Sequence, residues 1–333
     1  MSDQKPPAAM TMAQIARLAG VSRTAVSAVL NKRQGTTRLK PETRQRIETL
    51  LRQTRYRPSS VGKALVLRRS LLVGVMAQEV GWSFMPQALQ GIEDFAEDRG
   101  CGVLVMTGRH EPQREERVLE FLLERRTDGI ILAPLSGMSS RMRELLIEKK
   151  TPIVYLFHEP ADPLPGARAV RVDEVRLGQL AVQHLLEKGH RHIACIGMPP
   201  EIRQGIDLAA QAVPDAAVEH WEWETPRPEA PPGFHRWRQA DPQPTAVFVR
   251  GDEHACAFMN LALRFGFKVP DDLAIIGVDD LPPARDAVVP MTTISQPKYE
   301  QGFQAAKLLF DLMDGKPRNN VILKPELVPR QST

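Results

Sequence analysis

The spacing of apolar residues changes near residue 70. Before that point the spacing follows the 3.6-residue period of a helix. After it, short continuous apolar runs alternate with amphipathic stretches of helix length. The pattern predicts a small helical unit followed by a larger α/β unit, in which helices cover both faces of parallel sheets.

The first segment carries local signals for three helices. Thr11 and Gln14 have the spacing of a capping box, Gly20 is a natural helix stop, and Ser22 is a natural cap for a second helix. A third helix is expected to begin at Pro41, because proline is favoured at the first helical position. The apolar residues that recur at helical spacing in the three helices are Ile15, Leu18 and Ala19; Val26, Val29 and Leu30; and Ile47, Leu50 and Leu51. A helix, a short glycine-containing turn and a capped helix form the helix-turn-helix pattern.

The second helix has little bulk on its outer face, which we expect to carry Arg23, Thr24, Ser27 and Ala28. A helix that enters the major groove of DNA, about 12 Å wide, needs short or extended polar side chains on that face. Arg23 and Thr24 lie in the first turn, which usually meets the base edges. The pattern therefore predicts a recognition helix.

The charge distribution supports binding to nucleic acid. Residues 1–70 contain 15 Lys and Arg against 3 Asp and Glu, a net charge of +12, whereas the remaining residues have a net charge of −8. A basic head on an acidic body is typical of nucleic-acid-binding proteins. A short basic segment can also be a solvated tail, but the regular apolar spacing in the head argues against a tail.

The second segment contains two series of apolar runs, each typical of buried parallel strands. They are residues 71–77, 101–107, 129–135 and 152–157, followed by residues 192–197, 245–250 and 273–279. Two series predict two lobes with a cleft between them. Ligands of such folds bind beyond the carboxyl ends of the strands.

Composition narrows the class of protein. The chain has 333 residues, is 42% hydrophobic, and has no apolar run of membrane-spanning length. The first ten residues lack the apolar core of a signal peptide, so a cytoplasmic protein is expected. Cys101, Cys195 and Cys256 are odd in number and widely spaced within apolar runs, which predicts buried thiols.

Several motifs resemble the LacI/GalR family of bacterial repressors. They are "MAQIARLAGVSRTAVSAVLN", "ETRQRI", "YRPSSVGKAL", "DGIIL", "PIV", "GHRHIACIG", "LAIIGVDD" and "MTTISQP". The resemblance implies a helix-turn-helix domain at residues 1–58, a hinge helix and linker at 59–70, and a two-lobed, periplasmic-binding-protein-like α/β effector domain at 71–333. Lobe one is expected at about 71–170 with a return segment near 298–320, and lobe two at about 171–297 with the last strand.

The resemblance also implies a function. It is that of a sequence-specific transcriptional regulator, a repressor, that binds a palindromic operator as a homodimer. A small sugar-like metabolite in the cleft would control it, with no cofactor. The alternative from the same resemblance is a constitutive DNA-binding regulator that has lost its response to an effector.

The implied DNA contacts lie in the head and the hinge. They are Thr11, Ser22, Arg23, Thr24, Ser27, Ala28, Asn31, Ser60, Gly62, Lys63 and Leu65. Leu65 matches the leucine that family members insert into the central base step, although residues 59–67 can also be interpreted as a surface linker. Family members often carry arginine at the position of Ala28, so one guanine contact is expected to be absent. Lys32, Arg33 and Arg38 are either phosphate contacts or solvated side chains.

The implied effector contacts lie at strand ends in the body. Asp279 and Asp173 match cleft aspartates of the family, but each can also be a helix cap or a loop carboxylate. Phe84 matches an effector-contacting position or is a core aromatic, and Arg203 stands near the family's effector-binding arginine. Gly251 replaces the usual asparagine, which argues against a typical neutral sugar as the ligand.

The sequence argues against two further classes of protein. An enzyme would be expected to show a nucleotide-binding or nucleophile motif, and the chain has no G-x-G-x-x-G after the first strand of the body, no P-loop and no G-x-S-x-G. His190 and His192 could form a metal pair, but they match a family stretch that leads into a strand. The basic head and the absence of a signal peptide argue against a transport-type solute-binding protein.

Overall fold

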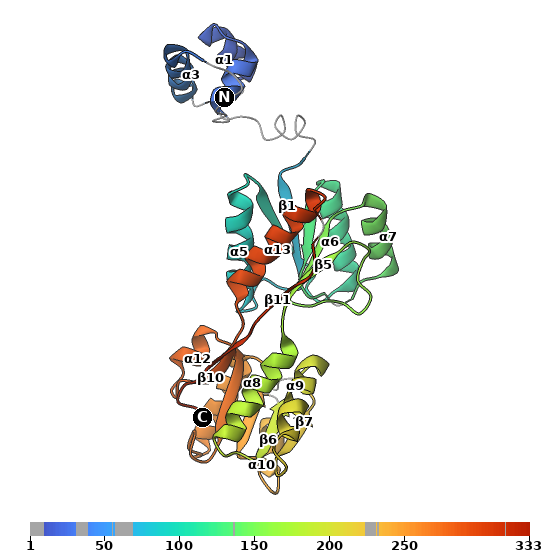
Figure 1. Cartoon of the computed structure of the whole chain (residues 1–333), viewed down its shortest axis with the longest axis vertical. Coiled ribbons are helices and arrows are strands. Elements are labelled where there is room, and N and C mark those ends of the chain that lie inside the picture. The colour runs from blue at the N-terminus through green and yellow to red at the C-terminus, as the bar shows by residue number, and fades with distance from the viewer. Residues whose placement is uncertain are drawn as a thin grey trace, which may run out of the picture. The chain divides into compact units, whose positions relative to one another are not determined.

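The computed structural model divides the chain into two compact units, Met1–Ser70 and Leu71–Thr333. It is shown as a cartoon in Figure 1. The structure describes residues 10–30, 39–54, 56, 69–135, 137–223, 231, 233–316 and 318–333. Each unit has its own hydrophobic core.

The first unit contains the three expected helices, α1 (Met12–Ala19), α2 (Arg23–Leu30) and α3 (Pro41–Gln53). Its core forms where the helices meet, and Ile15, Val26 and Ile47 are fully buried there. Leu18 follows the helical spacing but is 58% exposed. It lies three residues after the buried Ile15, so the packed face of α1 ends before this position.

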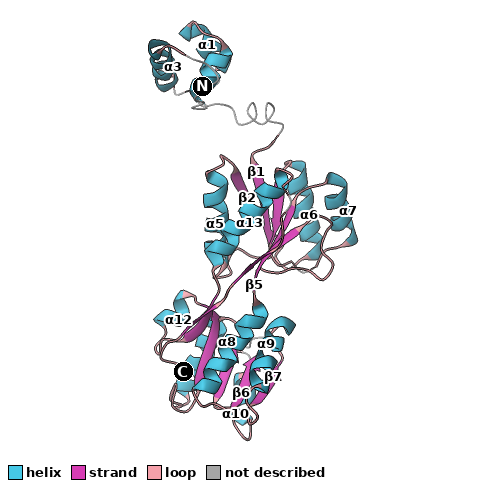
Figure 2. Ribbon diagram, in the orientation of Figure 1, coloured by secondary structure: helices cyan, strands magenta, loops and turns pink. Residues whose placement is uncertain are grey.

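The second unit contains two six-stranded sheets within the part of the chain that the structure describes (Figure 2). The first sheet consists, in spatial order, of β11 (Val321–Leu323), β5 (Arg168–Val172), β4 (Ile153–Leu156), β3 (Gly129–Leu132), β1 (Leu72–Ala77) and β2 (Gly102–Thr107). All of its pairs are parallel. Buried parallel strands read as continuous apolar runs, and this explains why the sequence located four of these six strands.

Helices cover both faces of the first sheet. Val73, Val75 and Ile131 point to one face and pack with α5 (Met85–Glu97) and α13 (Lys298–Met313). The alternate residues Met76 and Ile130 point to the other face. They pack with α6 (Pro112–Glu124) and α7 (Ser140–Lys149). The two-residue period of a strand thus divides one apolar run between two cores.

The second sheet repeats this arrangement. Its strands are, in order, β12 (Glu326–Val328), β10 (Thr292–Ser295), β9 (Ala274–Asp279), β8 (Ala246–Val249), β6 (His192–Ile196) and β7 (Ala217–Trp221). All of its pairs are parallel except β10 with β12. One face carries α8 (Glu174–Glu187) and α9 (Pro200–Gln211), and the other carries α10 (Phe234–Gln239), α11 (Asp252–Arg264) and α12 (Pro282–Asp286).

The chain passes between the two sheets three times. It leaves the first sheet after β5 to form α8, returns from β10 to α13, and crosses again between β11 and β12. Each sheet with its helices is one lobe, and the division agrees with the expected lobes, including the return segment near 298–320. Cys195 in β6 and Cys256 in α11 are buried, as expected, whereas Cys101 is partly exposed, contrary to expectation, because it precedes β2 at the sheet edge.

Candidate functional site

The helix-turn-helix of the first unit is built from the local signals that the sequence carries. The Oγ1 of Thr11 accepts a hydrogen bond from the Gln14 backbone N–H at 3.3 Å, and the Thr11 backbone N–H donates to Gln14 Oε1 at 2.7 Å. Gly20 ends α1 at φ +63°, a conformation in which glycine has no steric penalty. Ser22 Oγ then accepts from the Ala25 backbone N–H at 3.2 Å and starts α2.

The outer face of α2 presents fewer of the expected residues than the helical pattern suggested. Arg23 and Thr24 are exposed and Ser27 is half-buried, but Ala28 is only 8% exposed. The assignment of Ala28 to the outer face is therefore wrong. Ala28 follows the buried Ala25 by three residues, and its single methyl group is small enough to be covered at the edge of the packed face.

Other expected DNA contacts divide into two groups. Thr11 and Ser22 are exposed, and each directly precedes a helix, α1 and α2 respectively. The remaining ones, Asn31, Ser60, Gly62, Lys63 and Leu65, lie outside the described residues, as do Lys32, Arg33 and Arg38 and the whole of the expected hinge at 59–67.

The second unit contains a cavity of about 810 Å³ between its two lobes. Its walls are formed by segments that follow the strands: residues 82–84 follow β1, residues 157–159 follow β4, residues 250–254 follow β8, and Gln296 follows β10. The carboxyl ends of parallel strands from both sheets therefore meet at this cavity, which is the position expected for a ligand in such folds.

Phe84 and Asp279 both line the cavity, as expected. The ring of Phe84 packs edge-on against Phe157, with centroids 5.2 Å apart. Asp279 ends β9, and its Oδ1 accepts hydrogen bonds from Gln296 Nε2 and Lys298 Nζ, both at 2.8 Å. A carboxylate at the wall of a cavity can accept hydrogen bonds from the hydroxyl or amine groups of a ligand.

Asp173 and Arg203 do not line the cavity, and their expected placement there is corrected. Asp173 caps α8 by accepting the Arg176 backbone N–H at 2.9 Å. Arg203 turns back toward its own lobe, where it donates to the Met198 carbonyl at 2.7 Å and to Glu222 at 2.8 Å. Their neighbours in the sequence, Glu174 and Ile202, line the cavity instead.

Sequence reasoning missed most of the aromatic and charged wall. The aromatic members besides Phe84 are Trp82, Phe157 and Trp223, and the charged members besides Asp279 are Glu159, Arg171, Glu174, Glu201, Arg250, Asp252, Glu253 and Lys298. Arg250, Asp252 and Lys298 stand within three residues of strand ends, so the rule for ligand sites in α/β folds could have pointed to them. Trp223 carries no comparable signal.

Burial shifts the pKa of several groups in the wall. Burial, together with the charge of Glu201, raises the pKa of Glu174. Burial lowers the pKa of His158 and of His254, which favours their neutral forms. These residues therefore present a carboxyl group that holds its proton more tightly than usual and two imidazoles that can each donate and accept one hydrogen bond.

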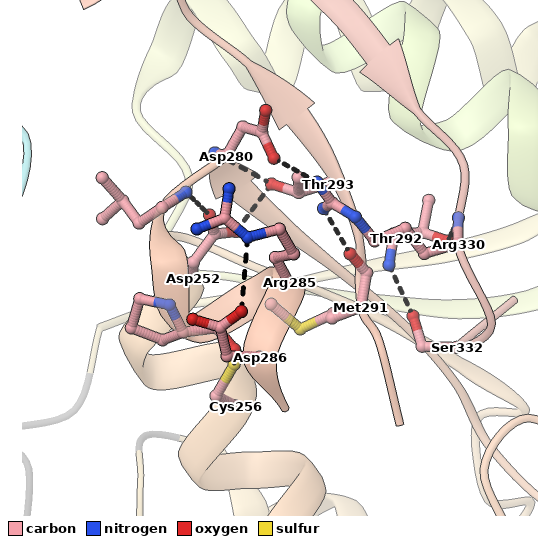
Figure 3. A network of polar contacts seen from close by, with 12 residues as sticks. Asp252, Cys256, Asp280, Arg285, Asp286, Met291, Thr292, Thr293, Arg330 and Ser332 are labelled. Carbon is pink, nitrogen blue, oxygen red and sulfur yellow. Dashed lines mark hydrogen bonds and ion pairs between the residues drawn. The ribbon is translucent and has the colours of Figure 1, made fainter. Parts of the chain in front are cut away.

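Asp252 is a buried residue that lines the cavity in the second lobe and belongs to a network of polar contacts there (Figure 3). Its Oδ1 accepts from Thr293 Oγ1 at 2.6 Å, and its Oδ2 accepts from the Leu281 backbone N–H at 2.7 Å. Burial raises the pKa of Asp252 to about 7, against the opposing effect of the two hydrogen bonds. Next to it, Asp280 pairs with Arg330 at 2.5 Å and ties the last residues of the chain to the loop after β9.

The candidate metal pair does not converge. His190 Nδ1 lies 3.0 Å from Thr245 Oγ1, and His192 Nε2 lies 2.7 Å from Glu219 Oε1. Among the described residues, no group of three or more His, Cys, Asp or Glu side chains is arranged to hold a metal ion. The two histidines instead hold strands and loops of the second lobe.

Three family models match the chain in order. "Bacterial regulatory proteins, lacI family" matches residues 11–59, "Periplasmic binding proteins and sugar binding domain of LacI family" matches residues 70–204, and "Periplasmic binding protein-like domain" matches residues 182–333. The HTH-type transcriptional regulator DegA of Bacillus subtilis is 32% identical over 97% of this chain and 98% of its own length. The chain belongs to the LacI family.

Another curated relative and two solved structures match nearly the whole chain. The HTH-type transcriptional repressor CytR of Escherichia coli is 28% identical and covers 100% of this chain and 99% of its own. A solved complex of the transcriptional regulator CelR with cellobiose is 26% identical, with a TM-score of 0.69 over 97% of this chain and 100% of that one. The Lac repressor dimer bound to operator and the anti-inducer ONPF is 23% identical with a TM-score of 0.78 over 97% of this chain and 99% of that one, and this likeness concerns the fold alone.

Membership in the LacI family establishes the coarse function of both units. The protein is a DNA-binding transcriptional regulator with an N-terminal helix-turn-helix and a periplasmic-binding-protein-like body. None of the helices in the described ranges is both long enough and apolar enough to cross a membrane.

Proposed function

We propose that the protein represses transcription by binding a palindromic operator as a homodimer, and that a small hydroxyl-bearing metabolite in the interlobe cavity controls this binding. A palindrome has two-fold symmetry, and two copies of one chain related by a two-fold axis match it. Its place of action is the cytoplasm, where bacterial DNA lies.

Support for the DNA part comes from α2 and the charge of the head. Arg23 and Thr24 are exposed in the first turn of α2, and the net charge of residues 1–70 is +12. Phosphate contacts of Lys and Arg supply affinity and position, whereas base-edge contacts supply specificity. The observation that best supports DNA binding is that Arg23 is exposed in the first turn of α2, a helix capped by Ser22.

Support for the control part comes from the cavity. Its volume of about 810 Å³ lies within the range of small-molecule sites. Its wall combines aromatic side chains with many charged and polar ones. CelR, the relative solved with cellobiose, shows that a similar fold can hold a sugar. The proposed ligand therefore combines hydroxyl groups for the polar wall with an apolar face for Phe84 and the tryptophans.

A selection experiment tests the DNA part. The full-length protein is incubated with random duplex DNA, and the retained sequences are read and then titrated by fluorescence anisotropy. We expect a palindromic motif and an affinity that falls by roughly 10³-fold or more between 50 and 200 mM salt, because each dimer releases many counterions. Salt-independent binding, or no recovered motif, would overturn the proposal.

Substitution of Arg23 tests the recognition helix. Arg23→Ala is expected to relax the base preference at one position of each half-site, by about 1–3 kcal/mol if the guanidinium contacts guanine with two hydrogen bonds. Arg264→Ala, at an exposed arginine of α11 in the body, is the matched control and leaves the motif unchanged. An unchanged motif with Arg23→Ala would remove this residue from base readout.

A second candidate is a regulator that binds its operator constitutively. The observation in its favour is that Asp279 is already paired with Lys298, while Gly251 and Ile202 bring no polar side chain to the cavity. A thermal-shift screen of sugars, sugar acids and sugar phosphates against the full chain, followed by operator titration with each hit, separates the two. Ligand-dependent operator release or capture supports control by a metabolite, and a screen with no hits supports the constitutive regulator.

A further inference from the structure

A buried ion pair joins the two lobes at the wall of the cavity. Lys298 is the first residue of α13, which packs on the first sheet, whereas Asp279 ends β9 of the second sheet. Lys298 Nζ lies 2.8 Å from Asp279 Oδ1, and the two side chains are 5% and 14% exposed. Both charges are thus largely withdrawn from solvent, and each comes from an element of a different lobe.

Two phenylalanines of the first lobe lie beside the ammonium group. Lys298 Nζ lies 4.8 Å from the centroid of the Phe84 ring and 5.3 Å from that of Phe157. A cation within about 6 Å of a ring face is attracted by the negative face of the π system, and more strongly when it is desolvated. The first lobe therefore holds the ammonium with aromatic faces, and the second lobe holds it with a carboxylate.

Asp279 is oriented for this contact by its own lobe. Gln296 Nε2 donates to the same oxygen, Oδ1, at 2.8 Å. The backbone of Asp279 has φ +112°, a region that residues with a side chain seldom adopt, and such strain persists only where surrounding contacts hold it. The carboxylate is thus directed by two independent restraints.

We propose that Lys298 is an internal occupant of the effector cavity: its side chain bridges the two lobes and determines which ligands the cavity accepts. Its ammonium neutralises Asp279 and occupies Oδ1. A ligand can therefore bind to Asp279 only through the remaining oxygen or by displacing Lys298. The proposal rests on the proposed function in one respect, that the cavity is the control site.

Removal of either Lys298 or Asp279 leaves the charge of the other residue buried and unpaired. For a buried, hydrogen-bonded pair this penalty is large, and it falls on the arrangement in which the lobes bury the pair, because separation of the lobes would return the orphaned charge to water. A ligand shifts the lobes only by its difference in affinity for the two arrangements. The strength of this ion pair therefore determines how the lobes are distributed between the two arrangements before a ligand binds.

Hydrogen exchange of the full-length protein, without DNA or ligand, tests the bridge. Lys298→Met keeps an unbranched apolar side chain against the phenylalanine rings but removes the charge. We expect amide exchange in residues 78–84 and 278–281, two segments that contribute wall residues from the first and the second lobe, to accelerate at least about tenfold. Lys307→Met, at an exposed lysine of the same helix, is the control and leaves exchange unchanged.

A double-mutant cycle distinguishes a bridge from a merely structural contribution of each residue. Asp279→Asn alone should accelerate amide exchange as Lys298→Met does. The exchange rate of the double variant should be no more than about twofold higher than that of either single variant, because both substitutions remove the same interaction. Asp279→Asn also keeps the test valid if Lys298→Met does not fold. Exchange of Lys298→Met equal to that of the Lys307→Met control, or single effects that multiply in the double variant, would overturn the bridge.

This outcome is separable from that of the proposed function. Exchange is measured without operator or metabolite, so a wild-type protein that recovers no DNA motif would overturn the proposed function and leave the bridge standing. Conversely, unchanged exchange in Lys298→Met with normal operator binding would overturn only the bridge.

Discussion

At the scale of single residues, Asp252 couples stability to pH. Burial raises its pKa from the ordinary value near 3.8 to about 7, so between those values the folded protein holds a proton that the unfolded chain has lost. Stability from this group is therefore fully present below about pH 4 and is lost as pH rises through 7. We expect the free energy of unfolding of the wild type, relative to Asp252→Asn, to fall by about 2–3 kcal/mol between pH 5 and pH 8.

Asparagine suits this comparison because its amide oxygen can accept from the Leu281 N–H while its NH₂ donates to Thr293 Oγ1, the two atoms that now contact Asp252. Urea unfolding at the two pH values measures the difference. Asp271→Asn, at an exposed aspartate, is the control. A wild type whose stability relative to Asp252→Asn does not change with pH would show that Asp252 is ionised throughout this range.

At the scale of elements, two glycines let α8 and α9 pack closely. A Cβ on Gly205 would lie 1.9 Å from the carbonyl oxygen of Val175, and a Cβ on Gly178 would lie 2.2 Å from that of Ile202. Alanine is favoured over glycine in a helix by about 1 kcal/mol, but here the helices would have to separate. We expect Gly205→Ala to lower the free energy of unfolding by about 1–3 kcal/mol and to displace the cavity wall that Glu174 and Ile202 form.

Denaturant unfolding of the full-length protein checks this expectation. Gly137→Ala is the control, because no atom lies within 4 Å of the Cβ that it would introduce. Its effect should stay within about 0.5 kcal/mol. A stabilising effect of Gly205→Ala would mean that the helix propensity of alanine outweighs the steric clash, and that α8 and α9 are not in close contact.

At the scale of the whole molecule, each unit has its own core. The core of the first unit is a small cluster around Ile15, Val26 and Ile47, whereas the second unit has large clusters on both faces of each sheet. Small domains bury a smaller fraction of their surface and are marginally stable. We expect calorimetry of the full chain to show a lower-temperature transition for the first unit and a higher one for the second.

Core substitutions assign the two transitions. Ile47→Ala removes a fully buried side chain, a change worth about 2–5 kcal/mol, and should abolish only the lower transition. Ile276→Ala, in the second sheet, should lower only the upper one. A single transition shifted by both variants would show that the two units unfold as one cooperative body.

The sequence by itself determined the local architecture and the family. The capping box at Thr11, the left-handed Gly20 and Pro41 set the helices of the head, because each acts on backbone groups within four residues. Continuous apolar runs located seven strands, because a strand buried on both faces is apolar throughout. The +12 charge of the head and the family motifs indicated a DNA-binding regulator.

Only the tertiary structure decided which side chains form the cavity. Asp173 and Arg203 lie next to its wall in sequence but turn to a helix end and a carbonyl of their own lobe, whereas Lys298 reaches Asp279 and the rings of Phe84 and Phe157. The burial of Ala28 was also decided by packing. The direction of a side chain depends on partners that lie far away in the chain, and local periodicity carries no information about them. The two rings that contact Lys298 lie 141 and 214 residues before it in the sequence.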